Sequence, residues 1–165
     1  MGTWFSALPA EVRSMHEISG DGEAAGDGSV SVGGGVAGSL IRRLMRFPPA
    51  GSYRLHVAFA ERDGAETWTR QFGEHRFSSR LSARRGRLAE RFGPLRFSFD
   101  VRSTARGLRM VLRGWDLCGL PLPMLLAPRI EASEWAEEGW FRFDVAVSLP
   151  PVGPVIHYRG RLRRV

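Results

Sequence analysis

The residues from Tyr53 to Val101 alternate apolar and polar side chains with a period of two. This alternation is typical of antiparallel strands that bury one face of a sheet. Each run ends at residues that favour turns, first at Asp63-Gly64 and then at Gly73, Gly86 and Gly93-Pro94. The pattern therefore predicts a series of strands joined by hairpins and excludes a mainly helical fold.

Turn residues continue to divide the chain after Val101. The expected strands cover residues 53–60, 66–72, 76–82, 87–92, 95–102, 108–117, 140–149 and 155–163. Residues 124–130 are either a further strand or an irregular edge, since Pro121 and Pro123 interrupt regular pairing just before them. A meander of eight or nine strands tends to curl or close, because closure removes its exposed edges. We expect residues 51–165 to form a curled or closed, barrel-like antiparallel sheet.

The first 50 residues have a different pattern. Helical spacing of apolar residues predicts one helix over 3–18 and another over 36–47, where Pro48 and Pro49 end the second. The glycine-rich stretch 20–35 between them is interpreted as a linker with a short strand at most over 30–32. With 165 residues the chain is predicted to be a single domain of the α+β class, mainly β, with two N-terminal helices.

The second helix is amphipathic. Its apolar stripe consists of Val36, Leu40, Ile41, Leu44 and Met45. Arg42, Arg43 and Arg46 are expected to face away from that stripe. A basic amphipathic helix can lie on a membrane surface. We favour the alternative, in which the stripe packs on the helix's own domain.

The composition limits the classes of partner and compartment. The net charge is +7, and all 24 basic residues are arginine, with no lysine and no asparagine in the chain. Such a composition is typical of a gene with biased codon usage, so the positive charge is only weak support for nucleic-acid binding. We do not expect this protein to bind nucleic acid. Without lysine, Schiff-base and phosphate-loop lysine chemistry are excluded. A single cysteine, Cys118, excludes an intrachain disulfide, and no apolar run is long enough to span a membrane as a helix, so we expect a cytoplasmic protein.

Three polar residues fall on the apolar face of the predicted sheet. Arg70, Ser79 and Glu90 lie on successive strands, and a buried charge is costly unless it is paired. Three interpretations stay open: an Arg70–Glu90 ion pair that fixes strand register, a polar anchor for a ligand head group, or Glu90 as a catalytic acid. The inward-facing aromatic residues of the candidate ligand site are Trp68, Phe97 and Tyr158.

Other chemistry finds little support in the sequence. The four histidines have no metal-ligand spacing, and no nucleophile elbow or phosphate-binding signature occurs, so we expect neither a metal nor a cofactor. His16 is interpreted as a surface or core histidine, and Cys118 as a small core residue.

Several short motifs, taken together, resemble a known bacterial family. They are Leu8-Pro9 with Val12-Arg13 and His16, Phe47-Pro48-Pro49-Ala50-Gly51, Trp68-Thr69-Arg70-Gln71-Phe72-Gly73, Phe77-Ser78-Ser79, Glu90-Arg91-Phe92-Gly93-Pro94, Gly119-Leu120-Pro121-Leu122-Pro123, Phe141-Arg142-Phe143-Asp144-Val145 and Tyr158-Arg159-Gly160. With these motifs the chain resembles the domain of unknown function 4166 over nearly its whole length. Members of that family occur alone or behind a saccharopine-dehydrogenase-like domain. The resemblance implies no mechanism, but it suggests a role in small-molecule metabolism.

These observations lead to a hypothesis about function. The favoured one is a module that binds an apolar or amphipathic small molecule inside the sheet. The second is an accessory domain for a dehydrogenase-like protein partner, which the family resemblance suggests. The third is an enzyme that uses Glu90 as an acid or base.

Overall fold

The structure is a computed structural model that describes residues 8–17, 20–84 and 86–165. Two α-helices, one 3-10 helix and eleven strands make up the described part. The helices are α2 (Ala10–His16), α3 (Gly35–Leu44) and the 3-10 helix η1 (Met124–Leu126). The strands are β1 (Gly22–Val32), β2 (Gly51–Arg62), β3 (Ala65–Phe72), β4 (His75–Arg84), β5 (Arg87–Phe92), β6 (Leu95–Ser103), β7 (Gly107–Leu117), β8 (Leu120–Pro121), β9 (Arg129–Glu137), β10 (Trp140–Leu149) and β11 (Gly153–Arg164).

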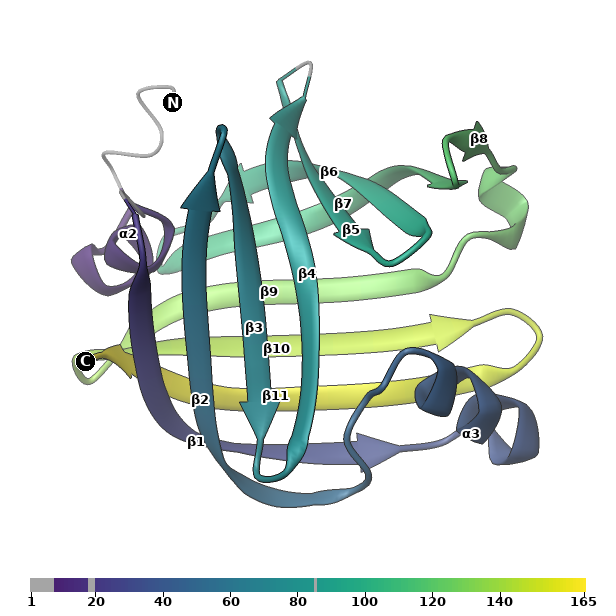
Figure 1. The fold of residues 1–165 in the computed structure, drawn as a ribbon, viewed down its shortest axis with the longest axis horizontal. Helices are drawn as coiled ribbons and strands as arrows, with labels where there is room; N and C mark the ends of the chain where they lie inside the picture. Colours follow the sequence, from purple (N-terminus) through teal and green to yellow (C-terminus); the bar gives the residue numbers. More distant parts are fainter. Residues whose placement is uncertain (1–7, 18–19, 85) are drawn as a thin grey trace.

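The sheet closes into an antiparallel barrel (Figure 1). The strand order is β6-β5-β4-β3-β2-β1-β11-β10-β9-β7, and pairing of β6 with β7 completes the ring of ten strands. The short β8 pairs with the end of β7 and lies outside the ring. The expected closed, mainly β fold with two N-terminal helices is therefore confirmed, although the predicted strand number of eight to nine was too low.

The two additional strands are β1 and β9. The stretch predicted as a linker, with a strand over 30–32 at most, forms the eleven-residue strand β1 between β2 and β11. Small residues on its inward side explain the weak sequence signal, and they allow β1 and β11 to approach each other closely. A Cβ atom at Gly160 of β11 would lie 2.5 Å from the carbonyl oxygen of Asp27. Close approach of two backbones requires glycine at such points.

One end of the barrel is closed by α2. Leu8, Val12 and Met15 are buried there, and α2 packs against β9, β10 and β11. Within the described residues, the helix predicted over 3–18 covers 10–16, and the apolar residues Trp4 and Phe5 of that prediction lie outside the described residues. The core is rich in aromatic side chains that contact one another across the barrel, among them Phe72, Phe77 and Tyr158.

The second helix, α3, differs from its prediction. Most of its apolar stripe does not pack on the barrel: Ile41 contacts the core, but Val36, Leu40 and Leu44 are exposed. The side that faces the barrel carries Gly38, which is buried, and Arg42, whose Nη1 donates hydrogen bonds to two backbone carbonyl groups. Arg42 was expected to face away, and the opposite is found, because these two carbonyl oxygens hold the arginine against the start of β11.

Candidate functional site

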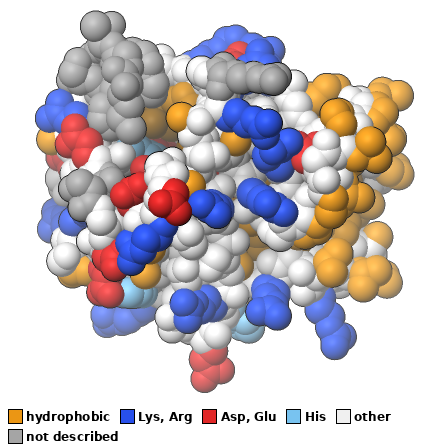
Figure 2. All heavy atoms as spheres, turned by 45° about the horizontal axis from the view of Figure 1, so that its top comes forward, with side chains coloured by type: hydrophobic (Ala, Val, Ile, Leu, Met, Phe, Trp, Pro, Cys, Tyr) orange, Lys and Arg blue, Asp and Glu red, His pale blue; other side chains and the backbone are white. Residues whose placement is uncertain are grey.

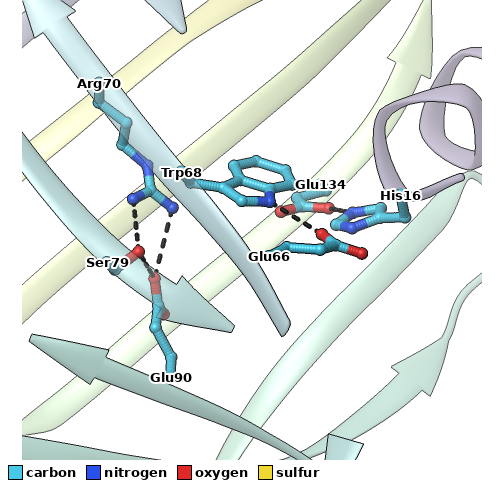
Figure 3. Close-up of polar contacts among 7 residues, drawn as sticks. All are labelled: His16, Glu66, Trp68, Arg70, Ser79, Glu90 and Glu134. Atoms are coloured by element: carbon cyan, nitrogen blue, oxygen red, sulfur yellow. Dashed lines mark hydrogen bonds and ion pairs between the residues drawn. The ribbon is translucent and has the colours of Figure 1, made fainter. Parts of the chain in front are cut away.

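A diagonal of three polar residues crosses strands β3, β4 and β5 inside the barrel (Figure 3). Trp68 pairs with Ser79, and Leu81 pairs with Glu90, so Arg70, Ser79 and Glu90 are diagonal neighbours on one face. Such neighbours are within reach of long side chains. The strand alternation predicted this inward placement, and the register brings the three groups together as expected.

Hydrogen bonds link the three side chains. Arg70 Nη1 donates to Ser79 Oγ at 2.8 Å, Arg70 Nη2 donates to Glu90 Oε1 at 3.3 Å, and Ser79 Oγ donates to the same oxygen at 2.6 Å. The Arg70 side chain is 15% exposed and that of Glu90 is 12% exposed. The ion pair is thus largely withdrawn from water, where breaking it by removing one partner is costly.

Aromatic rings surround the guanidinium group of Arg70. Its central carbon lies 5.3 Å from the ring centre of Trp68 and 5.7 Å from that of Phe77. Both distances are within the range of cation–π attraction. The rings therefore offset part of the cost of burying the charge and hold the group in the barrel interior.

A second polar cluster lies on the other side of Trp68 (Figure 3). His16, at the end of α2, has its Nε2 atom 2.5 Å from Oε2 of Glu134 on β9. The imidazole stacks on the Trp68 ring, and Trp68 Nε1 donates a hydrogen bond to Glu66. Two carboxylates and one imidazole thus surround the same indole ring.

The two carboxylates shift the pKa of His16. Burial alone would lower it, but the charge of Glu134, the hydrogen bond to Glu134 and the charge of Glu66 together outweigh burial. The pKa of His16 is therefore raised above its usual value of 6.5. The charged imidazolium is favoured in the folded protein, and it pairs with Glu134.

A cavity of about 50 Å³ lies inside the barrel, between β2 and β3 on one side and β9, β10 and β11 on the other. Its polar lining consists of Arg70, Glu134 and Tyr158, and the rest is apolar. Tyr158 is buried, and burial is the main cause that raises its pKa to about 12. Its hydroxyl group makes no hydrogen bond with any residue that the structure describes.

A larger, open depression of about 690 Å³ lies on the outer surface of the sheet. It is lined by arginines such as Arg54, Arg142 and Arg159. The internal cavity is the better candidate site, because its polar groups are withdrawn from water and converge on an enclosed space.

The chain matches the model of a protein family described as Domain of unknown function (DUF4166) over residues 8–162. The chain belongs to this family. The matched region begins just before α2 and ends within β11, so it includes every strand of the DUF4166 barrel. No curated protein matches the chain.

Within the DUF4166 barrel, the predicted site residues do not all lie together. Trp68, Arg70 and Tyr158 line the cavity, and Ser79 and Glu90 hold Arg70. Phe97 does not line the cavity; it is buried on β6, opposite Glu90.

Sequence reasoning missed two residues of the second cluster and misplaced the cysteine. Glu66 has the same parity on its strand as Trp68 and Arg70, so the alternation could have identified it. Glu134 lies on β9, a strand that was not predicted. Cys118 was expected in the core, but it is exposed, because it sits with φ of 52° in the turn between β7 and β8.

Two further observations concern metals and membranes. Within residues 8–17, 20–84 and 86–165, no three histidine, cysteine or acidic side chains are grouped so that they could hold a metal ion. No helix in the described part of the chain is both long and apolar enough to cross a membrane.

Proposed function

We propose that the DUF4166 barrel binds an apolar or amphipathic small molecule in its interior. The observation that carries the proposal is Tyr158, a cavity-lining residue whose hydroxyl has no hydrogen-bond partner among the described residues. A phenol hydroxyl can donate one hydrogen bond. A ligand with an oxygen acceptor in the cavity would accept the hydrogen bond that Tyr158 leaves unused.

Arg70 supports the same assignment. Nη1 and Nη2 each make one bond within the polar diagonal, and a guanidinium group has five N–H donors. Arg70 and Tyr158 both line one cavity. Carboxylate, phosphate and carbonyl oxygens all accept such bonds. The polar end of the ligand is therefore an oxygen acceptor, held at Arg70 and Tyr158.

The rest of the cavity suits an apolar chain or ring. Phe72, Phe143 and Val145 contribute to a wall with no charge of its own. The cavity of about 50 Å³ is well below the roughly 300 Å³ at which ligand pockets begin. A ligand larger than a few atoms must therefore displace side chains, and the half-buried inward residues Val145 and Val147 are the ones with space to move.

The geometry favours binding over acid catalysis by Glu90. Oε1 of Glu90 accepts hydrogen bonds from both Ser79 and Arg70, and Glu90 does not line the cavity. A general acid must lie within hydrogen-bond reach of the group that it protonates. Glu90 is therefore better placed to hold Arg70 than to reach a molecule in the cavity.

Native mass spectrometry of freshly purified protein tests the proposal, with dodecanoate and dodecyl phosphate as added probes. The parent protein should carry a small molecule or take up one of the probes. Tyr158→Phe should lose most of this binding and keep its fold, because the hydroxyl has no bond to lose within the described chain. Tyr53→Phe is the matched control, since the Tyr53 hydroxyl donates to the carbonyl of Pro49 on the surface. A parent protein that carries nothing and binds neither probe would overturn the proposal.

A further inference from the structure

The barrel end opposite α2 carries an exposed apolar surface. On α3, Val36 is 90% exposed, Leu40 68% and Leu44 80%. Soluble proteins seldom expose several large aliphatic side chains together, and such patches usually mark an interaction site. Most of the apolar side of α3 therefore faces away from the barrel.

A second segment adds to the same surface. Met124, Leu125 and Leu126 form the 3-10 helix η1, and Leu125 is 87% exposed. Figure 1 places α3 and η1 on the same side of the barrel, and Figure 2 shows hydrophobic side chains gathered along that side. We call the exposed apolar residues of α3 and η1 the apolar end.

Both segments of the apolar end lie in stretches of the sequence that have no acidic residue. The sequence has no acidic residue from Gly28 to Ala60, which includes all of α3, and none from Leu117 to Ile130, which includes η1. Arg43 and Arg46 are exposed beside the apolar side chains of α3. Apolar tips flanked by arginine are a combination that binds the headgroup region of an anionic bilayer.

We propose that the apolar end docks on the surface of an anionic lipid bilayer. The exposed residues are aliphatic or methionine and stand on two separate projections. Protein-binding hot spots are instead enriched in tryptophan and tyrosine and fill matching pockets. Aliphatic tips on projections need no matching pocket in a bilayer, which adapts to their shape.

The position of the apolar end also suggests how a ligand could reach the barrel interior, and this point rests on the proposed function. At the α2 end the inward side chains Phe141 and Leu162 are fully covered. Towards α3 and η1 the inward residues Ile130, Val147 and Leu149 are only half-buried. The less covered end of the barrel thus faces the bilayer, from which an amphipathic molecule can enter. Docking itself does not depend on ligand binding, and the two are measured separately.

Vesicle flotation tests the docking. The full chain is mixed with vesicles of phosphatidylcholine alone or of phosphatidylcholine with phosphatidylglycerol. We expect flotation with the anionic vesicles and much less with the neutral ones. Leu40→Ser and Leu125→Ser should each lower the partition coefficient by roughly tenfold, because each removes a buried aliphatic side chain. Val165→Ser is the matched control, an exposed apolar residue at the end of the chain that should leave flotation unchanged.

Other results would overturn the proposal. These are no flotation of the parent protein, or flotation that neither leucine variant reduces. A parent dimer in size-exclusion chromatography that Leu40→Ser converts to a monomer, without flotation, would assign the surface to a second copy instead. Specific binding to a purified dehydrogenase-like protein, again without flotation, would assign it to that partner. Tyr158→Phe should float like the parent, so failed docking and failed ligand binding remain distinguishable.

Discussion

The Nε2 atom of His16 lies 2.5 Å from Oε2 of Glu134, and this contact joins the end of α2 to the middle of the barrel wall. Both side chains are largely buried. The pair, together with the stacking of His16 on Trp68, orients the helix that closes this end. The closure is therefore sensitive to the protonation of one imidazole.

The raised pKa of His16 predicts how stability depends on pH. A group whose pKa is higher in the folded than in the unfolded state binds its proton more tightly when folded. Its contribution is fully present below the unfolded value, about 6.5, and is lost as the pH rises through the higher folded value. The melting temperature of the parent should therefore fall further as the pH rises from about 6.5 through the folded pKa of His16.

His16→Gln provides the comparison, since glutamine can hydrogen-bond to Glu134 but carries no titrating charge. Its melting temperature should be lower than that of the parent below pH 6.5, and the difference should shrink at higher pH. His56→Gln is a control, because His56 pairs with Glu23 on the exposed surface. Parallel pH profiles for parent and His16→Gln would refute the linkage.

Arg70 and Glu90 should each be costly to remove alone. Arg70→Ala leaves a buried carboxylate without its cation, and Glu90→Ala leaves a buried cation without its carboxylate. Each single change should lower the free energy of unfolding by about 3–5 kcal/mol. Replacing both by apolar residues should cost less than the sum of the two, as measured by denaturant unfolding in a double-mutant cycle.

An exposed ion pair serves as the reference for this cycle. Arg62 donates to Asp21 at 2.8 Å, but both side chains are 66% exposed. Solvent screens such pairs, so Arg62→Ala should unfold like the parent. If Arg70→Ala also behaves like the parent, burial of the Arg70–Glu90 pair does not contribute to stability.

The sequence predicted the polar diagonal because alternation determines which face a side chain occupies. From Trp68 to Phe99 the inward positions are mostly large and apolar, so Arg70 and Glu90 stand out among them. Once three strands pair in order, parity and register bring these residues together. No information from distant parts of the chain is needed for this part of the site.

The cluster of His16, Glu66 and Glu134, and the side of α3 that faces the barrel, depend on contacts between residues far apart in the sequence. The inward positions of β9 are Ile130, Ala132, Glu134 and Ala136, which do not alternate clearly enough to predict a strand. Helical spacing identified an apolar stripe on α3 but not what covers it. The side of α3 that faces the barrel was decided by Gly38 and Arg42, through close backbone approach and hydrogen bonds to distant carbonyl groups.

The narrow approach of β1 and β11 predicts that Gly160 tolerates no side chain. In Gly160→Ala the new Cβ would lie 2.5 Å from the oxygen of Asp27 and 2.9 Å from the ring of Phe143. We expect a loss of about 1–3 kcal/mol in the free energy of unfolding, as for other overpacked sites. Gly114→Ala is the control, since nothing lies within 4 Å of its added Cβ. Equal stability of the two variants would contradict the close approach.

The buried side chain of Tyr158 predicts a distinct alkaline titration. Burial is the largest cause that raises its pKa to about 12, because the phenolate is poorly solvated in the barrel. In absorbance titrations of the parent, one tyrosine should ionise near this value, and the step should vanish in Tyr158→Phe but persist in Tyr53→Phe. The raised pKa also makes folding favour the protonated phenol, so its contribution is complete below about pH 10 and is lost as the pH rises towards 12. Tyr158→Phe has no such proton to lose, and its stability should therefore decline less than that of the parent above pH 10. A titration step near the usual value of 10 for Tyr158, with equal alkaline stability of the two proteins, would mean that water reaches the hydroxyl freely and that the cavity is open to solvent.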